Sequence, residues 1–334
     1  MALGLPPQPL VDGPEPKCER EIVRKPGLFL IGAMKSGTNY LRKLLALHPS
    51  IFVTAIEEPS YFVEPRELQT IWPAMWARGY WRDERNYLQL FASAGEAAIL
   101  CEASTNYTKI PLVTGVAGRL HAFNPDARLI YLLRDPVERT ISHYWHMVRF
   151  HSEYRPIAAA IRRDPQYVAV SHYAMQLAPF LERFGSERIA VLTHEQLTRD
   201  PFATIQWLYR WLGLDAACVD VSGFAEPENV TPDVVQMPVW NGIPRKLWQS
   251  PLVKRIQPHL PQGLQDTLRE ATNRSVLRQA VDVTQATDYL RSIQRRQVDA
   301  LSDILGRGFP EWTTLNGRAD AAHGGTIRLR PLTG

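Results

Sequence analysis

The chain has 334 residues, of which 45% are hydrophobic and 22% charged, and a net charge of +4. These values are typical of a globular protein of one or two domains and exclude a disordered chain. No apolar run approaches the ~18 residues of a membrane span. The chain has no block of like charges of the kind that binds nucleic acid. Its three scattered cysteines lack the spacing of a zinc site or a disulfide framework. We therefore expect a cytoplasmic protein with no membrane span, nucleic-acid partner or metal.

In chain order, a proline-rich arm over residues 1–26 comes first, and we expect it to be flexible. Short apolar runs then alternate with helical patterns, which predicts a parallel α/β sheet covered by helices on both faces. Strands are expected at 28–31, 51–54, 97–101, 128–133 and 188–193. Helices are expected at 38–47, 84–93, 111–122, 137–150, 172–184, 201–212 and 284–306.

Two later stretches break this alternation. Residues 219–262 are rich in proline, which predicts a long irregular segment near a site. The Gly-containing tail at 314–334 is expected to be flexible. One domain over 27–313 is therefore expected to carry the function.

The most informative segment is GLFLIGAMKSGTNYL at residues 27–41. An apolar strand pattern reaches Gly32, a short loop holds Lys35 and Gly37, and apolar residues at helical spacing follow. The free N–H groups and positive dipole end of such a helix favour a phosphate, and the lysine adds a cation. Because this lysine precedes the second glycine, the loop differs from the G-x-x-x-x-G-K-[ST] loop of nucleotide triphosphatases.

A second group of polar residues follows the strand pattern at 128–133. Arg134 comes at the C-terminal end of this strand, where parallel sheets bind ligands, and Ser142 lies about two turns into the next helix. An arginine fork and a hydroxyl form a clamp for a second phosphate. A short echo of the motif contains Arg163, but a helical pattern precedes it, so the first copy is favoured.

Together, G-x-x-K-S-G-T at 32–38 and R-D-P-x-x-R-x-x-S-x-Y at 134–144 resemble the sulfotransferase family that uses 3′-phosphoadenosine-5′-phosphosulfate (PAPS). The segment HPSIFVTAIEEPSYF also resembles the H-P-x-I…K-E-P-x-F-F stretch of the branch that includes heparan-sulfate sulfotransferases. The resemblance extends over roughly 27–313. It implies a P-loop-like α/β fold in three layers, with helices on both faces of a parallel sheet.

The resemblance also implies roles for residues. It assigns the 5′-phosphosulfate of PAPS to five consecutive loop residues: Lys35, Ser36, Gly37, Thr38 and Asn39. Arg134 and Ser142 take the 3′-phosphate, and Tyr173 matches a position that contacts adenine. By analogy with phosphoryl transfer, Lys35 neutralises the charge that builds on the leaving phosphate.

The acceptor needs a general base. Glu57 and Glu58 follow a strand and precede an aromatic pair that favours desolvation of one carboxylate. The resemblance maps the catalytic glutamate onto Glu58, and we interpret Glu57 as a solvated loop charge. Glu102, after another strand, is the alternative base, or a ligand for the acceptor or for Lys35. The nearest candidate for a loop that closes over the 3′-phosphate is 241–248.

The leading hypothesis is a cytoplasmic sulfotransferase that moves the sulfuryl group of PAPS to a hydroxyl of a carbohydrate or small-molecule acceptor. A nucleotide kinase or triphosphatase with a degenerate loop is one alternative, which the absence of G-K-[ST] disfavours. A non-catalytic nucleotide-binding module is another, which the combination of Lys35 and a nearby glutamate disfavours. No motif names the acceptor or the oligomeric state.

Overall fold

The structure is a computed structural model. It describes these parts of the chain: 24–151, 153–219, 232–239, 250, 253, 255, 261–263 and 273–317. Most of the expected N-terminal arm, nearly all of the expected C-terminal tail and the candidate loop at 241–248 lie outside the described residues.

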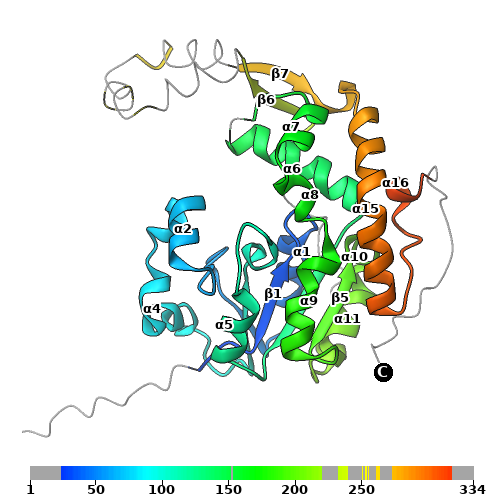
Figure 1. Cartoon of the computed structure of the whole chain (residues 1–334). Helices are drawn as coiled ribbons and strands as arrows, with labels where there is room; N and C mark the ends of the chain where they lie inside the picture. The colour runs from blue at the N-terminus through cyan, green and yellow to red at the C-terminus, as the bar shows by residue number, and fades with distance from the viewer. Residues whose placement is uncertain are drawn as a thin grey trace, which may run out of the picture.

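The centre of the molecule is a parallel sheet of five strands in the order β2-β3-β1-β4-β5 (Figure 1). Its strands are β1 Leu28–Gly32, β2 Ile51–Val53, β3 Ile99–Ala103, β4 Arg128–Leu133 and β5 Ile189–Thr193. The central strands are continuous apolar runs because both of their faces are buried. The predicted parallel sheet is thus confirmed.

Helices follow most strands, as the alternating pattern predicts. They are α1 Thr38–Leu45, α2 Pro65–Ile71, α3 Pro73–Trp76, α4 Glu84–Leu88, α5 Val116–Phe123, α6 Pro136–His151, α7 Ile157–Arg163, α8 Gln166–Ala169, α9 Tyr173–Phe184, α10 His194–Arg199, α11 Pro201–Trp211, α15 Thr284–Leu305 and α16 Thr313–Asn316. Short 3-10 turns include η3 Thr105–Thr108 and η7 Arg278–Ala280. Among the described residues, no helix combines the length and apolar character needed to cross a membrane.

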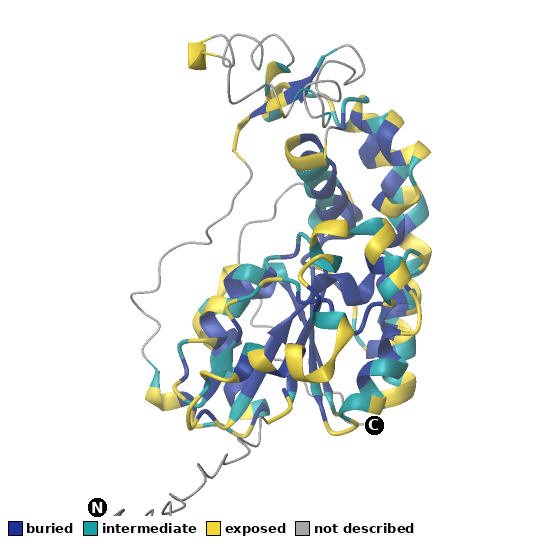
Figure 2. Cartoon of the chain, turned by 90° about the vertical axis from the view of Figure 1, so that its left-hand side faces the viewer, coloured by how far each residue is buried: buried dark blue, intermediate teal, exposed yellow. Residues whose placement is uncertain are grey.

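The sheet separates two buried cores, so the domain has the three layers that were predicted. On one face, Leu30 packs with residues of α1 and α11 such as Leu44 and Leu208. On the other, Phe29 belongs to the core that α5 and α9 complete through residues such as Leu120. Figure 2 shows the buried strands enclosed by helices that expose their outer sides. This arrangement leaves the carboxyl edge of the sheet as the place where loops can form a site.

Some elements differ from the prediction. The strand expected at 97–101 runs from Ile99 to Ala103, because Glu102 is buried with hydroxyl partners and continues the strand. The helix expected from 111 begins only at Val116, because Gly115 takes a left-handed φ of 69° at its N-cap.

The segment expected to be irregular contains a strand. β6 Val234–Pro238 pairs antiparallel with β7 Asn273–Leu277 and lies against α6 (Figure 1). Val235 and Met237 are buried on the inner face of β6, so alternating burial stabilises a strand inside a proline-rich stretch. The prediction of an irregular structure was therefore wrong for these residues.

The packed region is slightly wider than the predicted 27–313. Arg24 Nη1 donates a hydrogen bond to Ala97 O at 2.6 Å before β1 begins. At the other end, the N–H of Leu315 donates to Asp135 Oδ2 at 2.9 Å, and Leu315 is buried. The end of the described chain is therefore bound to Asp135, the residue that follows Arg134.

Candidate active site

The loop between β1 and α1 is shaped to present backbone N–H groups. Lys35 has φ 69°, and Gly37 has φ 92° at the N-cap of α1, where no side chain caps the helix. The hydroxyl of Ser36 is fully buried and has no hydrogen-bond partner among the described residues. An uncapped helix N-terminus and an unpaired buried hydroxyl are suited to the oxygens of an anion.

Gly32 is required where β1 enters this loop. A Cβ at this position, where φ is 148°, would lie 2.1 Å from Thr108 Oγ1 and 3.1 Å from a ring carbon of Tyr131. We expect Gly32→Ala to lower the free energy of unfolding by about 2 kcal/mol or more, as measured by urea denaturation. Gly118→Ala in α5 is the control, because a Cβ there meets nothing within 4 Å. Equal stability of the two variants would contradict the steric argument.

Lys35 lies in a strongly positive environment. Burial lowers the pKa of its ammonium, and the charges of Arg134, Arg149, Arg278 and Arg139 lower it further. No ion pair joins Lys35 to a carboxylate within the described parts of the chain. Because four arginine charges act on Lys35, the loop favours an anionic ligand.

Arg134 stands next to the loop, at the carboxyl end of β4. Its Nη1 lies 3.5 Å from the carbonyl oxygen of Lys35, and its Nη2 lies 3.5 Å from Glu138 Oε2. Ser142 lies one helical turn beyond Glu138 on α6, half-buried. The structure therefore brings Arg134 and the phosphate loop together. The second copy of the motif is elsewhere: Arg163 is an exposed residue at the end of α7.

The backbone of Arg134 is held by buried groups. The hydroxyl of Tyr173 donates to Arg134 O at 2.7 Å, and the ring packs between Tyr131 and Trp312 with only 1% exposure. The next N–H, of Asp135, donates to Glu195 Oε1 at 2.9 Å, and burial raises the pKa of Glu195 to about 7. Tyr173 therefore supports Arg134, and its contact with adenine stays a prediction.

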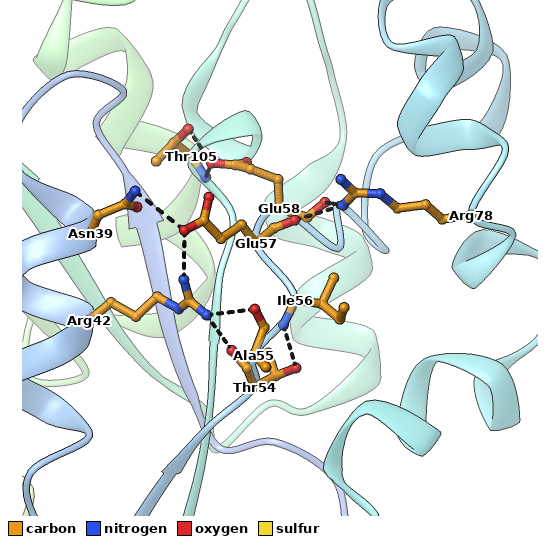
Figure 3. A network of polar contacts seen from close by, with 9 residues as sticks. All are labelled: Asn39, Arg42, Thr54, Ala55, Ile56, Glu57, Glu58, Arg78 and Thr105. Carbon is orange, nitrogen blue, oxygen red and sulfur yellow. Dashed lines mark hydrogen bonds and ion pairs between the residues drawn. The ribbon is translucent and has the colours of Figure 1, made fainter. Parts of the chain in front are cut away.

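Glu58 is fixed by three hydrogen bonds from η3. Its Oε1 accepts from the N–H and Oγ1 of Thr105 at 3.0 and 2.7 Å, and its Oε2 accepts from the N–H of Asn106 at 3.2 Å. Figure 3 shows the Glu58 side chain turned toward Thr105. Glu58 also has φ 52°, a strained value for a residue with a side chain. Its surroundings thus hold one defined carboxylate position.

Glu57 is directed the other way. Its Oε1 accepts from Arg42 at 3.1 Å and lies 3.4 Å from Asn39 Nδ2, and its side chain is 60% exposed (Figure 3). This agrees with a solvated loop charge. The sequence resemblance assigns Asn39 to the 5′-phosphosulfate, but in this structure its side chain donates a hydrogen bond to Glu57.

Glu102 is fully buried and has hydroxyl partners on both oxygens. Its Oε1 accepts from Ser104 and Tyr107 at 2.6 Å each, and its Oε2 accepts from Tyr87. Burial raises the pKa of Glu102 to about 7, although these hydrogen bonds oppose the shift. Ser104 also accepts from the N–H of Ser60, so the carboxylate anchors the loop that carries Glu58. A carboxylate with 0% exposure offers no surface to an acceptor.

Sequence reasoning did not find His194 and Lys109. His194, the first residue of α10, reaches the phosphate loop: a Cβ on Gly37 would lie 2.8 Å from its Nδ1. Burial and the charge of Arg134 lower the pKa of His194 to about 4, so its imidazole is neutral at pH 7. His194 directly follows β5, just as Arg134 directly follows β4, so the position after a strand could have identified it. Lys109, one residue past η3, has no such signal.

Comparison with known proteins adds to this geometry. A family model described as "Sulfotransferase family" matches residues 26–217. Heparan sulfate glucosamine 3-O-sulfotransferase 6 of Homo sapiens is 26% identical over 280 residues, which cover 80% of this chain and 72% of the relative. Heparan sulfate glucosamine 3-O-sulfotransferase 3A1 of Mus musculus is 25% identical, and the match covers 58% of this chain and 47% of the relative. The chain thus spans about half the length of some relatives.

A solved structure, a sulfotransferase from Alicyclobacillus acidocaldarius, has the same fold. Its TM-score is 0.59 at 24% sequence identity, and the match covers 86% of this chain and 99% of that one.

Proposed function

The chain belongs to the sulfotransferase family, and we propose that it transfers the sulfuryl group of PAPS to a hydroxyl of a carbohydrate acceptor. The family supports sulfuryl transfer. Relatives named heparan sulfate glucosamine 3-O-sulfotransferases support a carbohydrate hydroxyl as the acceptor. A cytoplasmic location stays a prediction.

One observation carries the assignment of the donor. Lys35 in the loop after β1 and Arg134 after β4 meet at one edge of the sheet, with Arg134 Nη1 3.5 Å from Lys35 O. Two cationic groups on neighbouring strands suit a ligand with two separate phosphate groups. The unpaired Ser36 hydroxyl and the uncapped N-terminus of α1 fit the same chemistry.

Different residues of the chain have different roles in this reaction. PAPS, when bound, supplies an activated sulfuryl group with a phosphate as its leaving group. Lys35 supplies positive charge at the loop where negative charge has to be balanced. Glu58 accepts the proton of the acceptor hydroxyl, because its carboxylate is held in one position by η3. Arg134 and Ser142 bind the second phosphate, so they determine affinity for the bisphosphate part of the donor.

The role of Arg134 can be tested without knowing the acceptor. We expect Arg134→Ala to weaken binding of adenosine 3′,5′-bisphosphate by about 10- to 100-fold, the loss typical of a hydrogen bond to a charged group. Binding of adenosine 5′-monophosphate, measured by the same calorimetric titration, should change little. Arg163→Ala is the matched control, because Arg163 occupies the equivalent position of the second, exposed copy of the motif.

Two results would count against this assignment. Equal losses for both nucleotides would show that Arg134 does not recognise the 3′-phosphate. A loss in Arg163→Ala as large as that in Arg134→Ala would transfer the role to the second copy.

A further inference from the structure

A buried cation lies beside the proposed base. Lys109 follows η3 directly and is only 8% exposed. Its ammonium donates to Asn106 Oδ1 at 2.6 Å and lies 4.8 Å from the ring centroid of Trp72. No carboxylate forms an ion pair with it among the residues the structure describes. A buried charge without a direct ion-pair partner destabilises a fold, so we ask what Lys109 does here.

Asn106 connects Lys109 to Glu58. The side chain of Asn106 accepts from Lys109 and donates to Ser60 Oγ at 2.9 Å, while its N–H donates to Glu58 Oε2 at 3.2 Å. Ser60, two residues after Glu58, is itself bound through its N–H to Ser104. Asn106 is thus fixed at three points, and one of them is the ammonium of Lys109. Releasing that point would loosen a hydrogen bond that sets the position of the Glu58 carboxylate.

The charged and titratable groups that influence Lys109 come from several elements. Burial lowers the pKa of Lys109 to about 8; the charge of Glu58 opposes this shift and that of Arg139 on α6 adds to it. On the same helix, burial lowers the pKa values of His143 and His146, and the charge of Lys109 contributes. Lys35 contributes to both histidine shifts as well. Within the described part of the chain, the negative charge that raises the pKa of Lys109 is therefore that of Glu58.

We propose that Lys109 is a positioning residue for the reaction, which acts through Asn106 to keep the Glu58 carboxylate aligned. This inference rests on the proposed role of Glu58 as the base. If Lys109 only filled space against Trp72, its loss of a proton would not change the rate of turnover.

The test is the pH profile of sulfuryl transfer from labelled PAPS, between about pH 6 and about pH 10. For the wild-type protein we expect kcat to fall above about pH 8, where Lys109 loses its proton. Lys109→Arg should move this fall to higher pH, because a guanidinium keeps its proton. Lys109→Met should lower kcat at pH 7 by about tenfold or more and remove the fall near pH 8.

The controls separate position from folding. Lys25→Met removes a lysine at the opposite edge of the sheet, where it pairs with Glu84 at 3.1 Å, and should leave the profile unchanged. Binding of adenosine 3′,5′-bisphosphate should be the same in Lys109→Met and wild type. The pKa of Lys35 is lowered too, but a fall caused by Lys35 would stay at the same pH in Lys109→Arg.

Wild-type kcat in Lys109→Met, or a fall at the same pH in Lys109→Arg, would overturn the proposal. If Glu58→Gln lost activity while Lys109→Met did not, the base would stand and Lys109 alone would be excluded. If Glu58→Gln kept full activity, both the base assignment and the route through Asn106 would be wrong.

Discussion

We expect that replacing Lys35 by alanine lowers the rate of sulfuryl transfer by about 10³-fold or more. The ammonium is the cation inside the phosphate loop, and the guanidiniums around it cannot take its place because their side chains start from other elements. The fold is kept, since alanine and lysine pay a similar cost for the left-handed φ of 69°. Removing a cation that burial and four arginines destabilise should leave the free energy of unfolding equal or higher.

The measurement is single-turnover transfer from labelled PAPS, with urea denaturation of the same samples. Lys43→Ala is the matched control, because Lys43 is an exposed residue of α1. It should keep wild-type turnover. Near-normal turnover of a folded Lys35→Ala variant would remove Lys35 from the reaction.

Glu58→Gln is expected to reduce kcat by about 10²-fold or more and to spare donor binding. Glutamine has the shape of glutamate and can still accept from Thr105, but it cannot take up the acceptor's proton. Its amide NH2 would also face the N–H of Asn106, a donor against a donor. Glu57→Gln, next in the chain and 60% exposed, is the control and should retain the wild-type rate.

Two patterns of result would contradict this assignment. An unchanged rate in Glu58→Gln would exclude Glu58 as the base. A parallel loss of bisphosphate affinity would mean that Glu58 organises the donor site instead of acting on the acceptor.

The parts of the fold that the sequence predicts are those with local signals. β1, the glycine loop and α1 follow from one apolar run, two glycines and one helical stripe. Arg134 follows from its place after an apolar strand, and the structure puts it against Lys35 O. These signals need no knowledge of distant partners, because strand and helix patterns are set by neighbouring residues.

Features that depend on distant partners were not predictable. β6 is stabilised by pairing with β7, which comes much later in the sequence. The many prolines of residues 219–262 predict an irregular segment instead. The burial of Tyr173 follows from Tyr131 and Trp312, which come from other parts of the chain.

The same holds for the site. The burial of Glu102 depends on hydroxyls from Tyr87 and Tyr107, and only the fold shows that they enclose it. Lys109 has no motif of its own. Its relation to Glu58 exists because η3 brings Asn106 between them.

The central claim is that one edge of the sheet binds PAPS and that Lys35 makes the bound donor reactive. The most direct measurement incubates the wild-type chain and Lys35→Ala with sulfur-labelled PAPS and a panel of glycans, and identifies the labelled product by mass. We predict label on a carbohydrate hydroxyl, with release of adenosine 3′,5′-bisphosphate, in the wild type and not in the variant. Equal labelling by the wild type and Lys35→Ala, or release of adenosine 3′,5′-bisphosphate by the wild type with no label on any glycan, would contradict the account.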